Sequence, residues 1–297
     1  MDAHAPLTEA RGAASAELDL LSSLELADLM NREDATVPAA VGAATEAIAA
    51  VVDEIVARLG AEGRLVYVGA GSSGRLAELD AAECEATFSV APGTVTAIVA
   101  GADARTAAER EAAEDDAVAG ARALAAANVG AADAVVAVSA SGSTPFALGA
   151  LGAARDTGAF TACVVCNEGS PLADACDREI VVVVGPEVLA GSTRLKAGTA
   201  QKLVLNMLST IAMVRLGKTY AGLMVDVMPS NAKLRARVRN IVAQATGASP
   251  ESVERALAAA DGEPKVAILS LVAGIDAAAA RERLTSAGGN LREALRS

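Results

Sequence analysis

Two loops rich in glycine and hydroxyl residues have the composition and position expected of phosphate-binding loops. The first, Gly69 to Gly74, carries Ser72 and Ser73, follows an apolar stretch at Leu65–Val68 and precedes a helix expected to start near Arg75. Backbone N–H groups at a helix start are unpaired and lie at the positive end of the helix dipole, and glycines let an anion approach them. The loop therefore predicts an anion site.

The same loop also satisfies the G-x-G-x-x-G pattern of dinucleotide sites through Gly69, Gly71 and Gly74. That pattern needs an acidic residue about 20 positions further on, at the end of the second strand, to bind the ribose hydroxyl. Residues 90–96 contain no acid, and Asp103 comes too late. A phosphomonoester is therefore favoured over NAD, and we expect no cofactor.

A second loop repeats the arrangement after another apolar stretch, residues 134–138, and before a helix expected from Phe146. Hydroxyl residues are also common helix caps, so a single loop of this kind is weak evidence for a site. Two of them at the carboxyl ends of parallel strands favour ligand binding, because open α/β sheets bind ligands at that edge. The predicted binding residues of the two loops are Ser72, Ser73, Gly74, Ser139, Ser141, Gly142, Ser143 and Thr144.

A third polar loop, residues 185–196, precedes an expected apolar helix at 197–216. Ser192, Thr193, Arg194 and Lys196 gather at the start of that helix. From spacing alone, an anion site and a capped helix flanked by solvated charges are equally supported.

The elements between these loops predict an α/β fold with a parallel sheet flanked by helices. Helical patterns in residues 8–60 include a capping box at Ser22–Glu25 and a long helix at 37–59. Strand patterns then alternate with helices. The expected strands are Leu65–Val68, Val95–Val99, Ala134–Val138, Thr161–Val165 and Ile180–Val184. We expect a helical arm packed on the core (1–60), a sugar-phosphate domain (61–246) and a small module of three helices (247–297).

The composition argues against several classes of function. The net charge is −12 and aromatic residues make up 2% of the chain, which disfavours nucleic-acid binding. No apolar run approaches a membrane span, and the N-terminal residues lack the basic and apolar regions of a signal peptide. We therefore expect a cytoplasmic protein that binds neither membrane nor nucleic acid.

Histidine chemistry and metal binding are also disfavoured. The chain has one histidine, His4, near an end expected to be mobile, and four cysteines. Cys163 and Cys166 are three positions apart on an expected strand and should face opposite ways, which predicts core cysteines rather than zinc ligands or a redox pair. Acid–base chemistry must then come from carboxylates, lysine, tyrosine or cysteine.

Two carboxylates are candidates for that chemistry. Glu83 shares a helix face with Leu76 and Leu79, which would place it toward the core, where burial raises a carboxyl pKa. Glu114 lies in an expected continuous helix at 106–127 and shares a stripe with Val118. From spacing alone, solvated surface acids remain the more common interpretation for both.

Long blocks of the chain resemble the N-acetylmuramic acid 6-phosphate etherases, a family built on the sugar isomerase (SIS) fold. The similarity covers nearly the whole chain and includes the blocks 8–11, 22–34, 69–76, 80–84, 113–116, 185–187, 196–208 and 223–227. It departs from the family pattern at three places. Glu85-Ala86 replaces Pro-Pro, Ser143 replaces an arginine, and Gly222 replaces an asparagine.

The resemblance implies a lyase that cleaves the D-lactyl ether of N-acetylmuramic acid 6-phosphate, in the recycling of cell-wall amino sugars. It implies that Glu83 and Glu114 are the catalytic acids, that the two hydroxyl loops bind phosphate, and that the protein is a homodimer. We add Glu187, Ser192 and Lys196 of the third loop to the predicted binding residues. A sugar-phosphate isomerase and a non-catalytic sensor of the glucokinase-regulator type are the alternatives.

Overall fold

The computed structural model describes residues 6–12, 17–227 and 232–297, so His4 lies outside the described residues. The chain divides into two compact units. One contains residues 1–82 and 93–209, and the other contains residues 83–92 and 210–297. Each unit is described below by itself.

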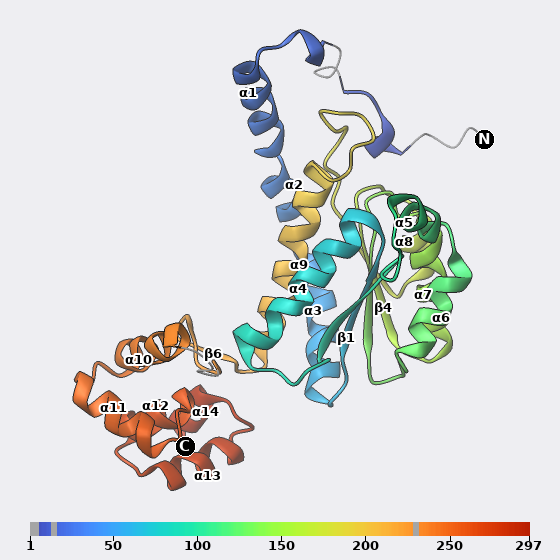
Figure 1. Cartoon of the computed structure of the whole chain (residues 1–297). Coiled ribbons are helices and arrows are strands. Elements are labelled where there is room, and N and C mark those ends of the chain that lie inside the picture. The colour runs from blue at the N-terminus through green and yellow to red at the C-terminus, as the bar shows by residue number, and fades with distance from the viewer. Residues whose placement is uncertain (1–5, 13–16, 228–231) are drawn as a thin grey trace. The chain divides into compact units, whose positions relative to one another are not determined.

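The first unit is built on a five-stranded parallel sheet, which confirms the predicted α/β class. Its order is β2-β1-β3-β4-β5 (Figure 1). The chain crosses from β1 to β2 on one side and then from β2 past β1 to β3 on the other side. This reversal makes the β1/β3 gap the topological switch point, where such sheets bind ligands. The strands are β1 (Leu65–Gly69), β2 (Val95–Val99), β3 (Ala134–Val138), β4 (Phe160–Val165) and β5 (Arg178–Val181).

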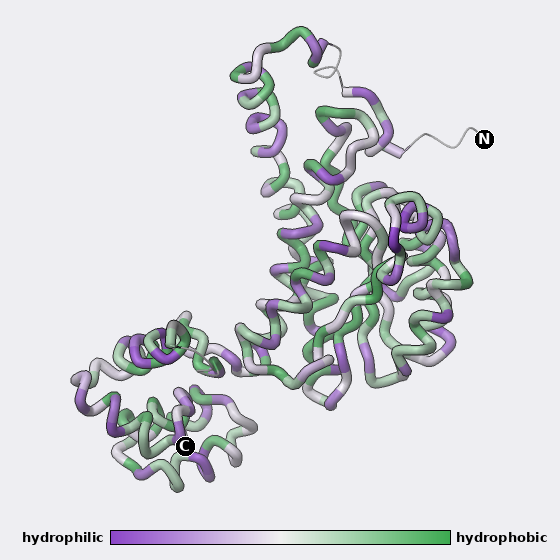
Figure 2. Tube along the Cα trace, in the orientation of Figure 1, coloured by the Kyte–Doolittle hydropathy of each residue, from purple (hydrophilic) through white to green (hydrophobic). Residues whose placement is uncertain are grey.

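Helices cover both faces of this sheet. In Figure 1, α3 (Thr45–Gly60), α4 (Gly71–Phe88) and α9 (Lys196–Arg215) lie on one side, and α6 (Ala117–Ala126), α7 (Pro145–Asp156) and α8 (Pro171–Ala175) lie on the other. A sheet covered on both faces needs apolar residues on both sides of each strand. Every residue of β1, β3 and β4 is buried, and these strands are largely hydrophobic in Figure 2.

Glycines let α6 and α7 approach each other closely. A Cβ atom on Gly120 would lie 2.0 Å from the Phe146 carbonyl oxygen, and one on Gly149 would lie 1.9 Å from that of Ala117. Both distances are far below van der Waals contact, so larger residues would force the helices apart. The start of α7, which follows the second hydroxyl loop, is therefore fixed by backbone packing.

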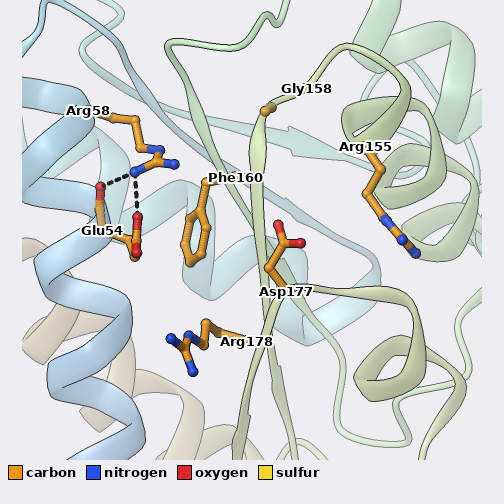
Figure 3. Close-up of a pocket in the computed structure, with 8 residues that line it drawn as sticks. Glu54, Arg58, Arg155, Gly158, Phe160, Asp177 and Arg178 are labelled. Carbon is orange, nitrogen blue, oxygen red and sulfur yellow. Dashed lines mark hydrogen bonds and ion pairs between the residues drawn. The ribbon is translucent and has the colours of Figure 1, made fainter.

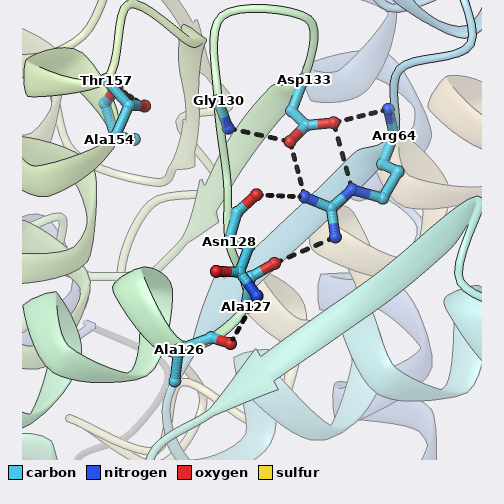
Figure 4. A network of polar contacts seen from close by, with 8 residues as sticks. All are labelled: Arg64, Ala126, Ala127, Asn128, Gly130, Asp133, Ala154 and Thr157. Carbon is cyan, nitrogen blue, oxygen red and sulfur yellow. Dashed lines mark hydrogen bonds and ion pairs between the residues drawn. The ribbon is translucent and has the colours of Figure 1, made fainter.

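An ion pair ties the amino ends of β1 and β3 together (Figure 4). Arg64 donates to Asp133 from its backbone N–H, Nε and Nη2, at 2.9, 3.2 and 2.7 Å. Its Nη1 and Nη2 also donate to the carbonyls of Ala127 and Asn128. Burial raises the pKa of Asp133, but the hydrogen bonds from Arg64 and Gly130 outweigh it and leave the pKa below its ordinary value.

The N-terminal segment is helical, as predicted, with one difference. It contains two short 3-10 helices, Leu7–Glu9 and Leu18–Leu20, followed by α1 (Ser23–Asp34), α2 (Val37–Ala43) and α3. The capping box at Ser22 is confirmed. The single helix predicted for 37–59 is wrong, because the chain bends by 60° between α2 and α3.

Among the described residues, no single helix is long and apolar enough to cross a membrane, although the bent pair Ser23–Ala43 and Thr45–Gly60 would qualify together by length and composition alone.

The second unit has its own hydrophobic core. A short antiparallel pair, β6 (Thr219–Tyr220) and β7 (Leu223–Met224), is followed by helices that pack around Val242, Leu257 and Ile268. This core also contains Val225 and Val227, so it begins upstream of residue 247, where we predicted a boundary. The helices are α10 (Ala232–Thr246), α11 (Pro250–Ala259), α12 (Pro264–Ala273), α13 (Ala277–Ser286) and α14 (Leu291–Arg296).

Candidate functional site

A cavity of about 730 Å³ lies at the carboxyl edge of the sheet. The loops that follow β1, β2 and β3 form most of its wall, so it spans the switch point between β1 and β3. Its polar lining residues are Glu9, Ser72, Ser73, Arg75, Glu78, Arg110, Glu111, Glu114, Ser139, Ser141, Thr144 and Thr193.

The first loop is held in shape by its glycines and presents both serines to this cavity. A Cβ on Gly69 would lie 2.9 Å from the Gly74 backbone, so the turn closes only with glycine. Gly71, at φ +54°, starts α4 within this loop, so the predicted helix start near Arg75 is too late. Ser73 Oγ donates to Gln201 Oε1 at 2.9 Å, which fixes its rotamer against α9. Gly74 packs against β1 and is not a lining residue, so its contribution is to the loop's shape.

The second loop is a connected set of hydroxyl groups around Ser139. Its Oγ lies 2.8 Å from Thr144 Oγ1 and 3.3 Å from Ser141 Oγ, and it accepts from the Gly142 N–H at 3.1 Å. Gly142 adopts φ +74°, and a Cβ there would lie 2.3 Å from Ser170 Oγ. Ser143 is exposed and donates to Ser141 Oγ at 3.0 Å. Ser139, Ser141 and Thr144 line the cavity, whereas Gly142 and Ser143 support them from outside its wall.

Glu114 reaches the cavity because the chain breaks the helix there. The continuous helix predicted for 106–127 is wrong: α5 (Ala107–Glu114) ends at Glu114, and Asp116 caps the start of α6 by accepting from the Ala119 N–H. The Glu114 carboxylate lies so close to the first loop that a Cβ on Gly71 would be 2.7 Å from its Oε1. Gly71 is therefore needed partly to admit this carboxylate.

Its surroundings favour the protonated form of Glu114. Burial is the main effect that raises the pKa of Glu114 above its ordinary value, and Asp115 raises it further. Arg75 opposes these effects, and Glu111 adds to them. A carboxyl group with a raised pKa at the wall of a polar cavity is suited to proton transfer near neutral pH.

Two arginines in the cavity wall were missed by the sequence analysis. Arg75 follows the first loop and donates from Nη2 to Ser72 Oγ at 3.3 Å, and Arg110 comes from α5. Both supply positive charge in a wall that also carries acids. Arg75 stands directly after the Gly-Ser-Ser-Gly run and could have been identified from its position. Arg110 could not, because only the fold of α5 brings it to the cavity.

The N-terminal segment also contributes to the site, which no sequence pattern indicated. Glu9 lines the cavity. Its neighbour Thr8 is fully buried and accepts from Asn167 Nδ2, which also donates to the Ala140 carbonyl of the second loop, both at 3.0 Å. The block Thr8-Glu-Ala-Arg therefore docks at the end of β4, next to the hydroxyl loop.

Some residues of the third loop reach the cavity, and others hold the start of α9. Thr193 lines the cavity, and Ser192 adjoins it without being a lining residue. Glu187 is fully buried and accepts from the N–H groups of Lys196 and Ala197, both at 2.9 Å, so it caps α9. Lys196 is buried, and its Nζ pairs with Glu33 at 2.7 Å. The roles predicted for these residues in ligand binding stay predictions.

Glu83 does not face the core, and that part of the prediction is wrong. The buried positions of α4 include Ala77, Asp80, Ala81 and Cys84, whereas Leu79 is 47% exposed and Glu83 is exposed. At 1.5 Å per residue, Glu83 lies about 18 Å along the helix from Gly71, where the Glu114 carboxylate sits. Glu83 therefore lies far along α4 from the first loop.

A second pocket, of about 440 Å³, lies at the opposite edge of the sheet (Figure 3). Arg58 stacks over the Phe160 ring at 5.0 Å, and Glu54 pairs with Arg58. None of the predicted site residues lines it.

No group of three or more histidine, cysteine or acidic side chains within the described residues is arranged to hold a metal ion.

Comparison with known proteins first defines the class. A model of the glucokinase regulatory protein N-terminal SIS domain matches residues 47–155, and a SIS domain model matches residues 116–211. The solved phosphoheptose isomerase of Francisella tularensis superposes with a TM-score of 0.52 at 20% identity, covering 65% of this chain and 100% of that one. The phosphoheptose isomerase of Neisseria gonorrhoeae gives 0.50 at 17% identity, covering 64% and 98%. These likenesses show a SIS-type α/β fold.

Relatives of much higher identity then define the family. This chain is 56% identical to the N-acetylmuramic acid 6-phosphate etherase of Streptomyces avermitilis, over 97% of this chain and 93% of the relative. It is 56% identical to the enzyme of the same name from Rubrobacter xylanophilus, over 97% and 95%. It is 48% identical to that of Mycolicibacterium smegmatis, over 99% of each chain. The chain belongs to the N-acetylmuramic acid 6-phosphate etherase family.

Proposed function

We propose that this protein is a carbon–oxygen lyase that converts N-acetylmuramic acid 6-phosphate and water to N-acetylglucosamine 6-phosphate and D-lactate. The observation that carries the proposal is the position of Glu114. A carboxyl group with a raised pKa lies against the first of two hydroxyl loops, in a cavity large enough for a sugar phosphate. Family membership supplies the reaction, and the cavity supplies groups suited to it.

The hydroxyl loops would bind the phosphate. Ser72 and Ser73 lie at the start of α4, where unpaired N–H groups favour an anion, and Ser141 and Thr144 add donors from the neighbouring loop. Arg75 and Arg110 would balance the substrate's negative charge, which includes a lactyl carboxylate. The family pattern has an arginine at position 143, where this chain has a serine. Arg75 and Arg110 would supply the positive charge that this arginine provides in the family pattern.

The chemistry needs only proton transfers. In the open-chain aldehyde, the carbonyl acidifies the C2 proton. A base removes it, the C3–O bond breaks with protonation of the departing lactyl oxygen, and water adds to the unsaturated aldehyde. We assign C2 deprotonation or ring opening to Glu114, and protonation of the leaving oxygen to Glu83. General acid–base groups of this kind each contribute about 10²–10⁴-fold to a rate.

Because Glu83 lies about 18 Å along α4 from the Glu114 side of the cavity, we propose that it serves the cavity of a second copy in a homodimer. The exposed face of α4 that carries Leu79 supports this. So does α1, whose described side chains include Leu24 at 72% exposure and a single buried residue, Leu29.

We also propose a cytoplasmic setting, in the recycling of cell-wall amino sugars. None of the four cysteines is in a disulfide, as in proteins of reducing compartments, and the predicted substrate is a phosphorylated sugar.

The test is to incubate the purified protein with N-acetylmuramic acid 6-phosphate in deuterium oxide and to measure D-lactate and deuterium at C2. Lactate release with deuterium at C2 is expected. Interconversion of sugar phosphates without lactate would instead identify an isomerase, and binding without turnover would identify a sensor. Lactate release without deuterium at C2 would contradict the elimination.

Subunit mixing tests the shared site. Glu83→Gln and Glu114→Gln homodimers should each be nearly inactive. If Glu83 acts on the partner's cavity, co-refolding the two variants makes heterodimers in which one cavity has both carboxylates, and up to one quarter of wild-type activity should return after random mixing. If each cavity uses its own Glu83, every cavity in the mixture lacks one carboxylate and no activity returns.

A further inference from the structure

Two cysteines far apart in the sequence meet beside the second hydroxyl loop. Cys163 lies in β4 and is buried, and Cys176 directly follows α8 and is half-buried. Their Sγ atoms are 3.6 Å apart. Cys166 is three positions from Cys163 in the sequence, but the thiol that lies next to Cys163 in the fold is that of Cys176.

We propose that Cys163 and Cys176 form a thiol modification site, in which a peroxide oxidises Cys176 and Cys163 then closes a disulfide. Only Cys176 offers solvent a route to the pair, because Cys163 is fully buried. The Sγ atoms must approach by about 1.5 Å to reach the disulfide bond length of about 2.05 Å.

The protonation of the pair suits this order of events. The hydrogen bond with Cys163 lowers the pKa of Cys176, and it outweighs the effects of burial and of Glu179 and Asp177. The same hydrogen bond and burial raise the pKa of Cys163 above its ordinary value. Cys176 is therefore the more acidic and more accessible thiol, which makes it the nucleophile, and Cys163 is the resolving thiol.

The reaction balances with hydrogen peroxide as the oxidant. The Cys176 thiolate attacks one peroxide oxygen, the O–O bond breaks, and the leaving hydroxide is protonated to water. Cys163 sulfur then attacks the sulfenic sulfur, the S–O bond breaks, and the Cys163 proton leaves with the second hydroxide as water. The two thiols lose two electrons to the peroxide, and two waters form.

The pair is connected to the candidate phosphate site through α8. Leu172 of α8 donates its N–H to the Gly142 carbonyl at 2.9 Å, and Ser170, which caps α8, packs against Gly142. Moving Cys176 toward β4 would pull on this short helix and hence on the loop that carries Ser139, Ser141 and Thr144. If the proposed function holds, oxidation should raise the KM for the sugar phosphate several-fold, and dithiothreitol should reverse the change.

The chemical arm of the test does not depend on function. The reduced full-length protein is treated with hydrogen peroxide, unfolded under acid quench, and mapped by mass spectrometry. We expect a 163–176 disulfide and the loss of two of its four thiols. The Cys163→Ala variant should accumulate a dimedone-reactive sulfenic acid at Cys176, and Cys176→Ser should form neither product. The buried Cys166→Ala is the matched control and should behave as wild type.

Peroxide treatment that leaves all four thiols intact, or that oxidises Cys84 or Cys166 before Cys176, would overturn the site. The kinetic arm compares KM before and after oxidation in wild type and Cys176→Ser. A cross-linked protein with unchanged KM would overturn the coupling to the loop. A protein that never turns over the sugar phosphate but still forms the disulfide would refute the proposed function alone, and hydrogen exchange of residues 139–144 would then measure the coupling.

Discussion

At the scale of single residues, Glu114 occupies a position where its neighbours and its helix work against ionisation. It is half-buried, it ends α5, and Asp115 and Glu111 stand beside it. Glu114 also lies at the negative end of the α5 dipole, which disfavours a charged carboxylate and so raises its pKa further. Such a group is costly to keep ionised in the folded state, as expected of a residue retained for chemistry rather than for stability.

The Glu114→Gln change tests whether the raised pKa of Glu114 shapes the pH dependence of the rate. If the Glu114 carboxylate is the base, the acid limb of the pH–rate profile should lie above the ordinary carboxyl pKa, because its pKa is raised. Glu114→Gln should lower kcat by about 10²–10⁴-fold and remove that limb. Glu46→Gln, at an exposed acid of α3 that does not line the cavity, is the control and should keep both. Retention of the limb in Glu114→Gln would assign it to another group.

The Ser141→Ala change tests the phosphate loop. Losing one hydrogen bond to a charged group costs about 1.5–3 kcal/mol, which corresponds to a KM roughly 10–150-fold higher. Ser286→Ala is the matched control, because the Ser286 hydroxyl donates to the Glu282 carbonyl and does not line the cavity. Steady-state kinetics should separate the two. Equal KM values in both variants would remove Ser141 from the phosphate site.

At the scale of elements, the site depends on the close packing of α6 against α7 and on the ion pair that joins the amino ends of β1 and β3. Gly120 and Gly149 bring α6 and α7 together, which fixes Thr144 and Pro145 at the start of α7. At the amino ends of the strands, the Arg64–Asp133 pair aligns the first residues of β1 and β3, so that Leu65 lies opposite Ala134. The register then pairs Gly69 with Val138, so both hydroxyl loops start side by side.

The Gly149→Ala change should destabilise the protein although alanine is the better helix former. Helix propensity alone predicts a gain of about 1 kcal/mol. The new methyl group would lie 1.9 Å from the Ala117 carbonyl oxygen, and overpacking of this kind costs about 1–3 kcal/mol or more. Gly152→Ala, on the same helix with open space around it, should show only the gain. Urea unfolding measures both, and stabilisation in both variants would contradict the close packing.

The Asp133→Asn change should lower stability in a pH-dependent way. The pKa of Asp133 is depressed in the folded state, so its contribution is present above the unfolded pKa and is lost as pH falls through the folded pKa. At pH 7 the loss should be about 1.5–3 kcal/mol, since hydrogen bonds to a charged group are removed, and the difference from wild type should shrink in acid. Asp261→Asn, at an 81% exposed side chain paired with Arg281, should change little. A loss independent of pH would argue against an ionic contribution.

At the scale of the whole molecule, the strands and both hydroxyl loops could be predicted because their signals are local. The buried face of α4 could not be predicted in this way. Its leucines suggested a core face, but Ala77, Asp80, Ala81 and Cys84 are the buried residues, and Leu79 is exposed. The resemblance named Glu114, but its place at the cavity wall could not be predicted from spacing. The helix break that puts it there depends on the local cap at Asp116, within a stretch whose alanines favour a continuous helix. Glu9 and Arg110 reach the cavity only through long-range folding.

Assembly is the property of the whole molecule that the site itself requires, if Glu83 is to act. We expect light scattering to show a dimer at micromolar concentration. Leu24→Asp places a charge on the exposed apolar side of α1 and should convert the dimer to a monomer, with activity lost because the partner's Glu83 is withdrawn. Val118→Asp, at a similarly exposed apolar residue of α6, is the matched control and should stay dimeric and active.

A fully active wild-type monomer would refute the shared site. A Leu24→Asp dimer with normal activity would move the interface away from α1, and Leu79→Asp would then test the exposed face of α4 that carries Glu83.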